Sequence, residues 1–250
     1  MKRLVVLAFA LLFQLCSCSA AGPRQYVLET VKSYPHDRHA YTQGLFFHNG
    51  TLYESTGQCG KSSFRVVDLE SGKPLRKVDF ARKYFGEGSV ILDGLMYMLT
   101  WTNKVAFVYD AETLKHIKTY SYPREGWGLT TDGKQLIASD GSAFLYFMDK
   151  DFQVQKKLKV TMGERTIRLL NELEWVNGRI WANVYTTDMI VIINPSSGKV
   201  EGLVDCNGLL PEQLKDSNTD VLNGIAVNDD RIYLTGKNWP RLYEVRLIEK

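Results

Sequence analysis

One glutamate in the sequence has an unusual setting. Glu87 lies between two glycines in the segment Phe85-Gly86-Glu87-Gly88. Glycines allow unusual backbone angles and the close approach of another molecule. A carboxyl group whose pKa is raised toward neutrality can act as a general acid or base. Glu87 is therefore the first candidate for a catalytic residue.

Residues of matching character lie at the ends of other short apolar segments. The amide and ammonium donors are Gln43, Asn171 and Lys237. Such donors can hold a carbonyl oxygen as negative charge develops on it. The aromatic residues are Trp101, Trp127 and Tyr185, and aromatic walls would grip an organic ligand and disfavour charge on a nearby carboxyl group. Singly, each of these residues, like Asn223, is equally explained as strand capping or packing, so their meaning depends on whether the fold brings them together.

Other chemistries find no support in the sequence. The four histidines, His36, His39, His48 and His116, have no zinc-ligand spacing with each other or with cysteine. There is no glycine-rich phosphate loop before a helix and no Gly-x-Ser-x-Gly elbow. The formal net charge of +3 is spread along the chain, so nothing indicates nucleic acid as a partner.

A repeat organises the chain. Five segments share a small or polar pair, a short apolar strand, a tight turn and a second apolar strand: TQGLFFHNGTLYEST, GEGSVILDGLMYMLT, GWGLTTDGKQLIASD, LNELEWVNGRIWANV and LNGIAVNDDRIYLTG. The turns HNG, LDG, TDG, VNG and NDD hold residue types that accept the positive φ angles of hairpins. Measured between the residues that open each segment (Gln43, Glu87, Trp127, Asn171 and Asn223), the spacing is 44, 40, 44 and 52 residues.

A third and a fourth strand follow in each unit, as in VVDLESGK and PLRKVDF. Four antiparallel strands in about forty residues are typical of a β-propeller blade. The sequence therefore predicts an all-β, five-bladed β-propeller over residues 24–250. No helical period is sustained, and residues 210–215 are expected to form a single turn.

The last unit lacks a fourth strand, which the chain supplies elsewhere. Residues 26–35, YVLETVKSYP, resemble the fourth strand HIKTYSYP of an inner unit. We expect this N-terminal strand to complete the last blade and close the ring, which removes exposed edges. A closed ring is expected to be a monomer.

The repeat also predicts where the chemistry gathers. In a propeller the innermost strand starts at one rim of the central channel and the second strand returns to that rim. Gln43, Glu87, Trp127, Asn171 and Asn223 should therefore surround one channel mouth, together with Trp101, Tyr185 and Lys237 from the ends of second strands. Asp140 is a further acid near this rim, although Ser139-Asp140-Gly141-Ser142 also has the composition of a turn.

The first twenty residues predict export. Lys2 and Arg3 precede an apolar run that is too short to remain as a membrane span. Leu15-Cys16-Ser17-Cys18 resembles a bacterial lipobox, which would make Cys18 an acylated mature N-terminus; ordinary cleavage after Ala20 is the alternative. We therefore expect a periplasmic protein or a membrane-anchored lipoprotein. Cys59 and Cys206 would form a disulfide or stay as free thiols.

Several motifs, in order along the chain, resemble the plant and bacterial type of glutaminyl cyclotransferase. They are HDRHAYTQGL (36–45), FGEG (85–88), LTW (99–101), GWGLTTDG (126–133), LNELEWVNGRIWANVY (170–185), LNGIA (222–226) and TGKNWP (235–240). The resemblance runs from about residue 36 to the end. It implies a five-bladed propeller that needs no metal for catalysis, while a structural divalent cation is compatible with it.

The resemblance also implies an active site. It places catalytic or polar binding roles on Glu87, Gln43, Asn171 and Lys237, and aromatic ones on Trp101, Trp127, Tyr185, Phe85 and Tyr41. Tyr185 and Tyr41 stand where the family commonly has Trp and Phe, which bears on substrate preference. The implied substrates are peptides or proteins that begin with glutamine.

The implied reaction is attack of the substrate's α-amine on its own side-chain amide carbon, with loss of ammonia. Glu87 would move the proton from the amine to the leaving nitrogen. Lys237, Asn171 and Gln43 would either hold the amide oxygen as negative charge develops on it or fix the substrate's own carbonyl. Two alternatives are a non-catalytic propeller that binds peptide ends or a small ligand, and a metal-dependent propeller hydrolase. The second is disfavoured because Glu87 is the one carboxylate among the five residues that open the repeated segments.

Overall fold

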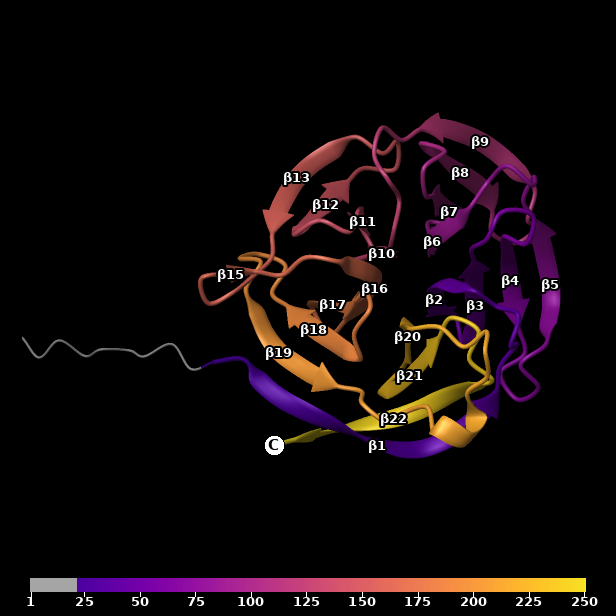
Figure 1. Ribbon diagram of the computed structural model, residues 1–250. Coiled ribbons are helices and arrows are strands. Elements are labelled where there is room, and N and C mark those ends of the chain that lie inside the picture. Colours follow the sequence, from indigo (N-terminus) through magenta and orange to yellow (C-terminus); the bar gives the residue numbers. More distant parts are fainter. Residues whose placement is uncertain (1–21) are drawn as a thin grey trace, which may run out of the picture.

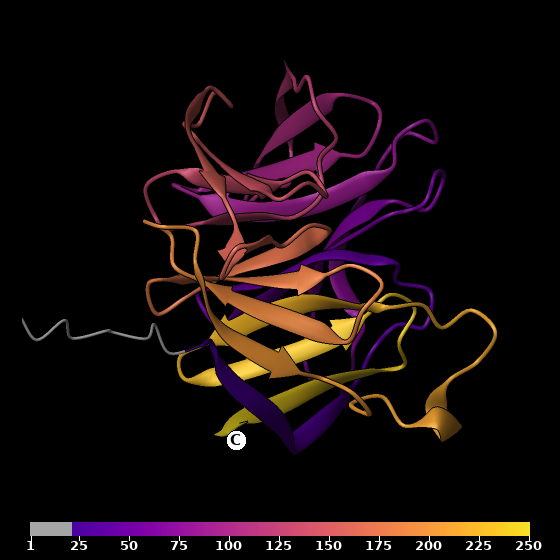
Figure 2. The same cartoon turned by 60° about the vertical axis from the view of Figure 1, so that its left-hand side comes forward.

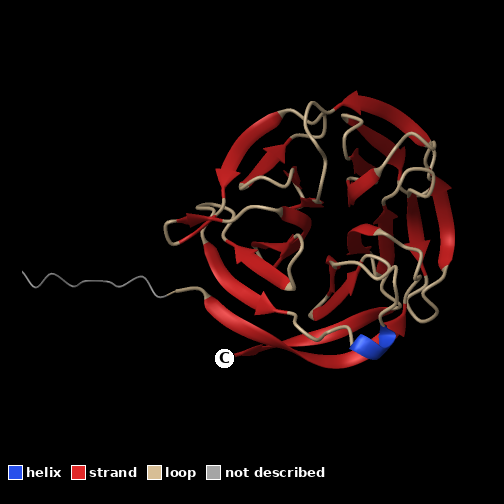
Figure 3. Ribbon diagram, in the orientation of Figure 1, coloured by secondary structure: helices blue, strands red, loops and turns tan. Residues whose placement is uncertain are grey.

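Strands dominate the structure, a computed structural model that describes residues 22–250. The expected export signal, with Cys18, lies outside these residues. Within them the one helical segment is a 3-10 turn, η1 (Glu212–Leu214), which falls in the stretch where a turn is expected (Figure 3). No helix of the described part is long and apolar enough to span a bilayer. The prediction of an all-β fold is confirmed.

Three sheets are antiparallel meanders of four consecutive strands. The first contains β2 (Thr42–His48), β3 (Thr51–Thr56), β4 (Ser63–Val67) and β5 (Pro74–Asp79). The second contains β6 (Gly86–Leu92), β7 (Leu95–Thr100), β8 (Val105–Asp110) and β9 (His116–Ser121). The third contains β10 (Leu129–Thr131), β11 (Leu136–Ser139), β12 (Phe144–Met148) and β13 (Val154–Lys159). A short hairpin, β14 (Thr161–Met162) and β15 (Arg165–Thr166), follows it.

The remaining eight long strands form one sheet of two further meanders. One consists of β16 (Leu170–Val176), β17 (Arg179–Val184), β18 (Met189–Ile193) and β19 (Val200–Asp205). The other consists of β20 (Leu222–Asn228), β21 (Arg231–Gly236), β22 (Arg241–Glu249) and β1 (Arg24–Pro35). The first strand of the chain thus lies beside the last (Figure 1).

The pairing of β1 uses both of its edges. It runs antiparallel to β22, with Tyr26 opposite Glu249 and Pro35 opposite Arg241. At its other edge, residues 24–27 pair in parallel with β19, where Arg24 lies opposite Gly202. Figure 2 shows β1 at the periphery of the molecule and the loop with η1 extending away from the strands.

The first strands of the five meanders lie next to one another around the centre of the molecule. β2 contacts β6 and β20, β10 contacts β6 and β16, and β16 contacts β20. Five buried apolar clusters fill the spaces between neighbouring meanders, as the alternation of apolar residues along each strand requires. The turns between first and second strands follow the sequence signal: Asn177 and Gly178 adopt φ angles of 47° and 75°, as a two-residue hairpin turn demands.

Each long inner strand has a register irregularity near its first residues. The pairing shifts between Thr42 and Gly44, Gly86 and Ser89, Leu170 and Leu173, and Leu222 and Ile225. A β-bulge releases one or two residues from the ladder and re-aims their side chains. The residues released are Gln43, Glu87, Asn171, Asn223 and their neighbours, which explains why these strands begin with polar residues.

Five hydrogen bonds join neighbouring meanders near these irregularities. Ser55 Oγ donates to the Glu87 carbonyl at 2.7 Å, Gly88 N to the Trp127 carbonyl at 2.7 Å, Ser139 Oγ to the Asn171 carbonyl at 2.7 Å, Gly224 N to Asn183 Oδ1 at 3.0 Å, and Asn223 Nδ2 to the Thr42 carbonyl at 2.9 Å. Inner strands have no ladder partner on their central edge, so these bonds satisfy backbone groups that would otherwise be buried unpaired.

The glycines beside Glu87 have a different role from the one expected. Neither Gly86 nor Gly88 has a positive φ angle. A Cβ atom at Gly88 would lie 2.4 Å from Leu129 N and 2.6 Å from the Trp127 carbonyl oxygen. The prediction of unusual backbone angles is therefore wrong, and Gly88 permits the close approach of the neighbouring strand.

Candidate active site

One pocket, of about 190 Å³, lies at the bulged ends of the inner strands. It is lined by Tyr41, Gln43, Phe85, Glu87, Trp101, Trp127, Asn171, Tyr185 and Lys237. These are the nine residues named from the sequence, so the structure brings all of them together. They come from positions 41–237 of the chain and meet because each meander delivers its first strand, or the end of its second, to this side.

Aromatic rings form most of the pocket wall. Phe85 packs edge-on against Trp101 with ring centroids 5.5 Å apart and against Tyr41 at 6.1 Å. Trp127 packs edge-on against Tyr185 at 5.6 Å. Trp101 remains 41% exposed, which makes it the most open of the rings. The wall is thus rigid and apolar, with one indole reaching toward solvent.

Glu87 lies at the base of these rings and is only 4% exposed. None of the residues that the structure describes donates a hydrogen bond to its carboxyl group. Burial raises the pKa of Glu87 well above its ordinary value, the Lys237 charge opposes this, and the Glu125 charge adds to it. Burial thus shifts the pKa of this carboxyl group in the direction that general acid or base catalysis requires.

Lys237 is the cationic counterpart of Glu87 and is 3% exposed. Its Nζ lies over two aromatic faces, 4.7 Å from the centroid of Tyr41 and 4.8 Å from that of Tyr185. Burial lowers the pKa of Lys237, while the charges of Glu87 and Asp220 counteract the effect. Cation–π contacts stabilise the ammonium group without occupying its N–H donors, which stay free for a ligand.

Two amides complete the polar set. Asn171 is buried, and its Oδ1 has no hydrogen-bond partner among the described residues. Gln43 Oε1 accepts a bond from Asn223 Nδ2 at 3.3 Å. Because this contact occupies the oxygen of Gln43, its NH₂ group is left to donate. The pocket therefore combines one proton-exchanging acid with several unpaired donors around an apolar space large enough for a small side chain.

Comparison with known proteins assigns this architecture to a family. The profile of the glutamine cyclotransferase family matches residues 3–247. The chain belongs to the glutamine cyclotransferase family. It is 43% identical over 229 residues to a glutaminyl-peptide cyclotransferase of Arabidopsis thaliana, covering 88% of this chain and 71% of the relative. Its fold matches the crystal structure of a glutaminyl cyclase from Myxococcus xanthus with a TM-score of 0.85 and 35% identity, over 91% of this chain and 99% of the other.

Sequence reasoning missed Glu125, which does not line the pocket but supports two of the residues that do. A single carboxylate oxygen of Glu125 accepts the indole N–H of Trp101 at 2.9 Å and that of Trp127 at 3.1 Å. Glu125 thus fixes two walls of the pocket. It lies two residues before Trp127 in the same loop, but its bond to Trp101 spans 24 residues, and nothing local in the sequence indicates that contact.

Asn223 is placed outside the pocket lining, directly behind it. It is fully buried and donates to both the Thr42 carbonyl and Gln43 Oε1. Asn223 therefore orients Gln43 and joins two meanders. Tyr41 has a similar external support, since its hydroxyl donates to Asp220 Oδ2 at 3.0 Å.

Two more carboxyl groups lie on an inner strand, just after Asn171. Glu172 is 1% exposed and accepts Leu45 N at 3.2 Å and Ile225 N at 2.9 Å. Glu174 accepts Val227 N at 3.2 Å. Both satisfy the central edges of neighbouring inner strands. Glu87 stays the one carboxylate among the five residues that open the repeated segments, but other buried carboxylates lie on the inner strands with it.

The remaining candidates have structural surroundings. Asp140 Oδ1 accepts Ser142 N at 3.0 Å, as in a turn. Cys59 is exposed and Cys206 is buried, and they do not pair with each other. Within residues 22–250, no group of three or more His, Cys, Asp or Glu side chains is arranged to hold a metal ion.

Proposed function

We propose that this chain converts the N-terminal glutamine of peptides and proteins to pyroglutamate with release of ammonia. The observation that carries the proposal is the buried Glu87 carboxyl group, without a hydrogen-bond partner in the described chain and surrounded by five aromatic rings, beside the donors of Lys237, Gln43 and Asn171. The names of the relatives from Arabidopsis and Myxococcus support the same reaction.

The chemistry needs little more than proton transfer and positioning. The α-amine of a peptide has a pKa of about 7.7–8.0, so a usable fraction is a free nucleophile at neutral pH. It attacks the Cδ of its own side-chain amide, and a tetrahedral oxyanion forms. The Glu87 carboxylate takes a proton from the attacking nitrogen and, as the C–N bond breaks, gives it to the departing ammonia. Such transfer typically accelerates a reaction by about 10²–10⁴-fold.

The donors act on oxygen. Lys237 Nζ and the Gln43 NH₂ group would hold the amide oxygen as it becomes negative. The unpartnered Asn171 Oδ1 is matched to an N–H donor, such as the substrate's own amine or amide nitrogen. The aromatic walls hold the side chain folded back on the amine, which converts the reaction to a well-oriented intramolecular one.

The deciding experiment incubates the purified protein with a glutamine-initiated peptide and measures ammonia. Release of one ammonia per pyroglutamate formed supports the proposal. Binding of the peptide without ammonia would leave the alternative, a propeller that recognises peptide N-termini. A parallel reaction with a chelator tests metal dependence, and we expect full activity there, since no catalytic step above uses a metal. A structural cation would instead show as a lower melting temperature in the chelator.

We further propose that the five meanders form a five-bladed β-propeller closed by β1. The contacts of β2, β6, β10, β16 and β20 with one another and the pairing of β1 with β22 support this closure. Deleting residues 24–35 should abolish soluble folding, because β22 would be left as an open edge. A circular permutant that begins at His36 and carries residues 24–35 after Lys250, through a short turn, should fold again. A stable, soluble deletion variant would contradict closure.

Residues 24–250 would then act as a single, monomeric domain. The sequence before it supports export to the periplasm, with a lipid anchor on Cys18. Growth with a radioactive fatty acid should label the wild type and not a Cys18→Ser variant, whereas an unlabelled wild type would indicate ordinary secretion after cleavage at Ala20.

A further inference from the structure

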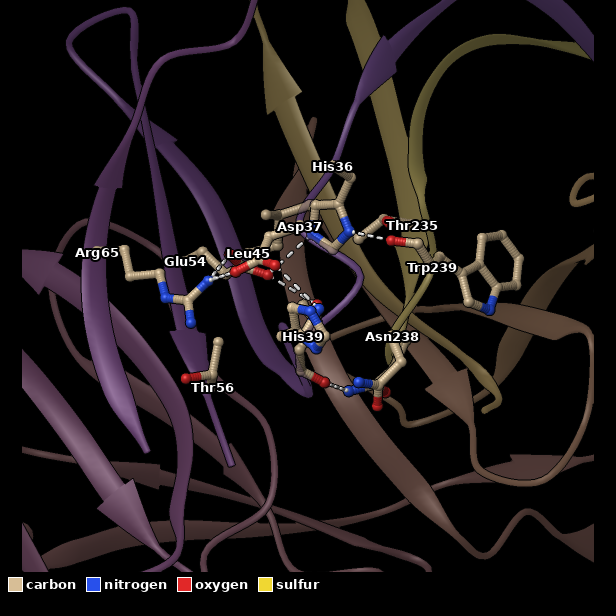
Figure 4. Close-up of polar contacts among 12 residues, drawn as sticks. His36, Asp37, His39, Leu45, Glu54, Thr56, Arg65, Thr235, Asn238 and Trp239 are labelled. Atoms are coloured by element: carbon tan, nitrogen blue, oxygen red, sulfur yellow. Dashed lines mark hydrogen bonds and ion pairs between the residues drawn. The ribbon is translucent and has the colours of Figure 1, made fainter. Parts of the chain in front are cut away.

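A buried polar network lies behind the pocket, where the segment after β1 crosses β3 and the turn between β21 and β22 (Figure 4). The side chains of His36, Glu54 and Arg65 are 5%, 3% and 9% exposed. Arg65 Nη1 lies 2.7 Å from Asp37 Oδ2 and 3.8 Å from Glu54 Oε2. None of these residues lines the pocket, so the proposed reaction does not explain them.

The contacts of His36 fix its protonation. Nδ1 lies 2.7 Å from the Trp239 carbonyl oxygen, which can only accept, so Nδ1 carries a hydrogen. Nε2 lies 3.0 Å from Glu54 Oε1, and the same oxygen accepts the hydroxyl of Thr42 at 2.7 Å. With Arg65 nearby, Glu54 is an ionised acceptor, and Nε2 must also donate. His36 is therefore a buried imidazolium with two acceptors.

The segment that contains His36 holds the turn at Lys237 from several points. The His36 backbone N–H donates to the Pro240 carbonyl at 3.0 Å. Asn238, with a φ angle of 60°, donates its backbone N–H to the Ala40 carbonyl at 2.7 Å and its side-chain amide to the Arg38 carbonyl at 2.9 Å. A left-handed non-glycine residue is retained only where the surroundings enforce it. The backbone at Lys237 is thus set by residues 36–40.

The same network reaches a second pocket residue. Thr42, which shares Glu54 Oε1 with His36, directly precedes Gln43 on the bulge of β2. Glu54 therefore links the turn that presents Lys237 to the strand that presents Gln43. The two oxygen-binding donors of the pocket are joined through one ion pair.

We infer that His36 is a positioning residue of the active site: as an imidazolium it ties the Gly236–Trp239 turn to Glu54 and so sets Lys237 relative to Gln43. The inference rests on the proposed function as far as catalysis is concerned. The charge state of His36 and the placement of Lys237 do not depend on the proposed function. Burial on its own lowers the pKa of His36, but the charge and hydrogen bond of Glu54, the hydrogen bond to the Trp239 carbonyl and the charge of Asp37 raise it above the ordinary value, the direction that favours the imidazolium.

The charge state is tested by ¹⁵N NMR of the full mature chain. We expect both ring nitrogens of His36 to show protonated shifts at neutral pH and to keep them above the ordinary histidine pKa of about 6.5. One unprotonated ring nitrogen at neutral pH would overturn the inference, whether or not the protein is a cyclase.

The placement is tested with two variants that divide the contacts. The side-chain amide of Asn reaches the position of Nδ1, and that of Gln the position of Nε2. His36→Asn should therefore keep the bond to the Trp239 carbonyl, and His36→Gln should lose it. Each variant keeps one of the two contacts and breaks the other, so either one cuts the link between the turn and Glu54, and we expect both to lower kcat/KM by about 10- to 100-fold, as expected for a misplaced group. His116→Gln, on the outer strand β9, is the control and should be neutral.

Two further readouts exclude a general loss of structure. In a Lys237→Ala background, His36→Gln should cost less than about twofold more, because a residue that acts through Lys237 has nothing left to position. Equal losses in both backgrounds would overturn the inference. Independently of activity, the side-chain signals of Lys237 should carry ring-current shifts from Tyr41 and Tyr185 that are lost in both His36→Gln and His36→Asn. Unchanged shifts in His36→Gln would also overturn it.

Discussion

Glu54 and Glu87 are two buried glutamates on neighbouring sheets whose surroundings give them opposite chemistry. Glu54 is 2% exposed, and the charges and hydrogen bonds of His36, Arg65 and Thr42 outweigh the effect of burial and lower its pKa. Glu87 is 4% exposed, receives no hydrogen bond from the described residues, and burial raises its pKa. Burial alone therefore does not decide the state of a carboxyl group; the donors around it do. One glutamate is an ionic link in the scaffold, and the other has the surroundings expected of the proposed proton carrier.

Replacing the proton carrier should give the largest effect. Glu87→Gln preserves the size and polarity of the side chain but removes the titrating proton, so turnover should fall by at least about 10²-fold and up to about 10⁴-fold. The loss is measured as ammonia release under saturating peptide. The melting temperature should stay close to that of the wild type, because Gln has nearly the shape of Glu and adds no charge to the buried site. Near-normal turnover would remove Glu87 from the mechanism.

The matching change in the scaffold should act on stability. Glu54→Gln leaves the buried His36 without its carboxylate, while Arg65 keeps Asp37, and breaking a buried pair in this way typically costs about 3–5 kcal/mol in the free energy of unfolding. Urea unfolding at neutral pH measures this loss. A cost below about 1 kcal/mol would show that the two glutamates differ less than their surroundings imply.

The pH dependence of the scaffold pair has two sides. The folded pKa of Glu54 is lowered, so its contribution to stability is present above about 4.5 and is lost as the pH falls through the folded value. The folded pKa of His36 is raised, so its contribution is complete below about 6.5 and is lost as the pH rises through the folded value. The excess stability of the wild type over the double variant Glu54→Gln/His36→Asn should therefore be greatest between these limits.

Glu174 provides an intermediate case with a weaker expected effect. Burial raises its pKa to about 8, against an ordinary value of 4.5. The folded chain thus holds a proton that the unfolded chain releases, and stability falls as the pH rises from about 4.5 to about 8. Glu174→Gln should remove this fall. The stability of the variant minus that of the wild type at the same pH should therefore be larger at about pH 9 than at about pH 5. Parallel pH–stability curves for the two proteins would contradict the assignment.

The smallest effect is expected at Glu125, which is exposed. Glu125→Gln weakens the acceptor shared by Trp101 and Trp127, and exposed charged contacts are worth at most about 1 kcal/mol, so KM should rise by no more than about fivefold. Because the Glu125 charge helps to raise the pKa of Glu87, the acidic limb of kcat/KM should move to lower pH. Glu112→Gln, also exposed, is the control and should leave the limb in place.

The fold and most of the pocket could be predicted because both follow from the repeat. Five copies of one strand–turn–strand pattern fix where first strands begin, and that alone brings Gln43, Glu87 and Asn171 to one side of the molecule. The hairpin turn at Asn177-Gly178 has a local signal of the same kind. Such features are encoded within a few residues, so a single sequence reveals them.

The contacts that could not be predicted join residues far apart. Glu172 and Glu174 alternate with Leu173 along a buried strand, which indicates two polar residues on one face, but the N–H groups that they accept belong to β2 and β20. His36 meets Glu54 and Trp239 across 18 and 203 residues. The role of Gly88 could not be predicted either, because the backbone that approaches it belongs to the neighbouring strand of the same chain.

The five hydrogen bonds between meanders have a consequence for how the pocket behaves in solution. Four of them use the backbone carbonyl groups of Thr42, Glu87, Trp127 and Asn171. The last three of these residues line the cavity, so residues that shape it also join one meander to the next. The cavity cannot widen at one place unless the hydrogen bonds between two neighbouring meanders break. Amide hydrogens at these contacts between meanders should therefore exchange only through global unfolding. The pocket should have its final shape before a ligand binds, rather than close around the ligand.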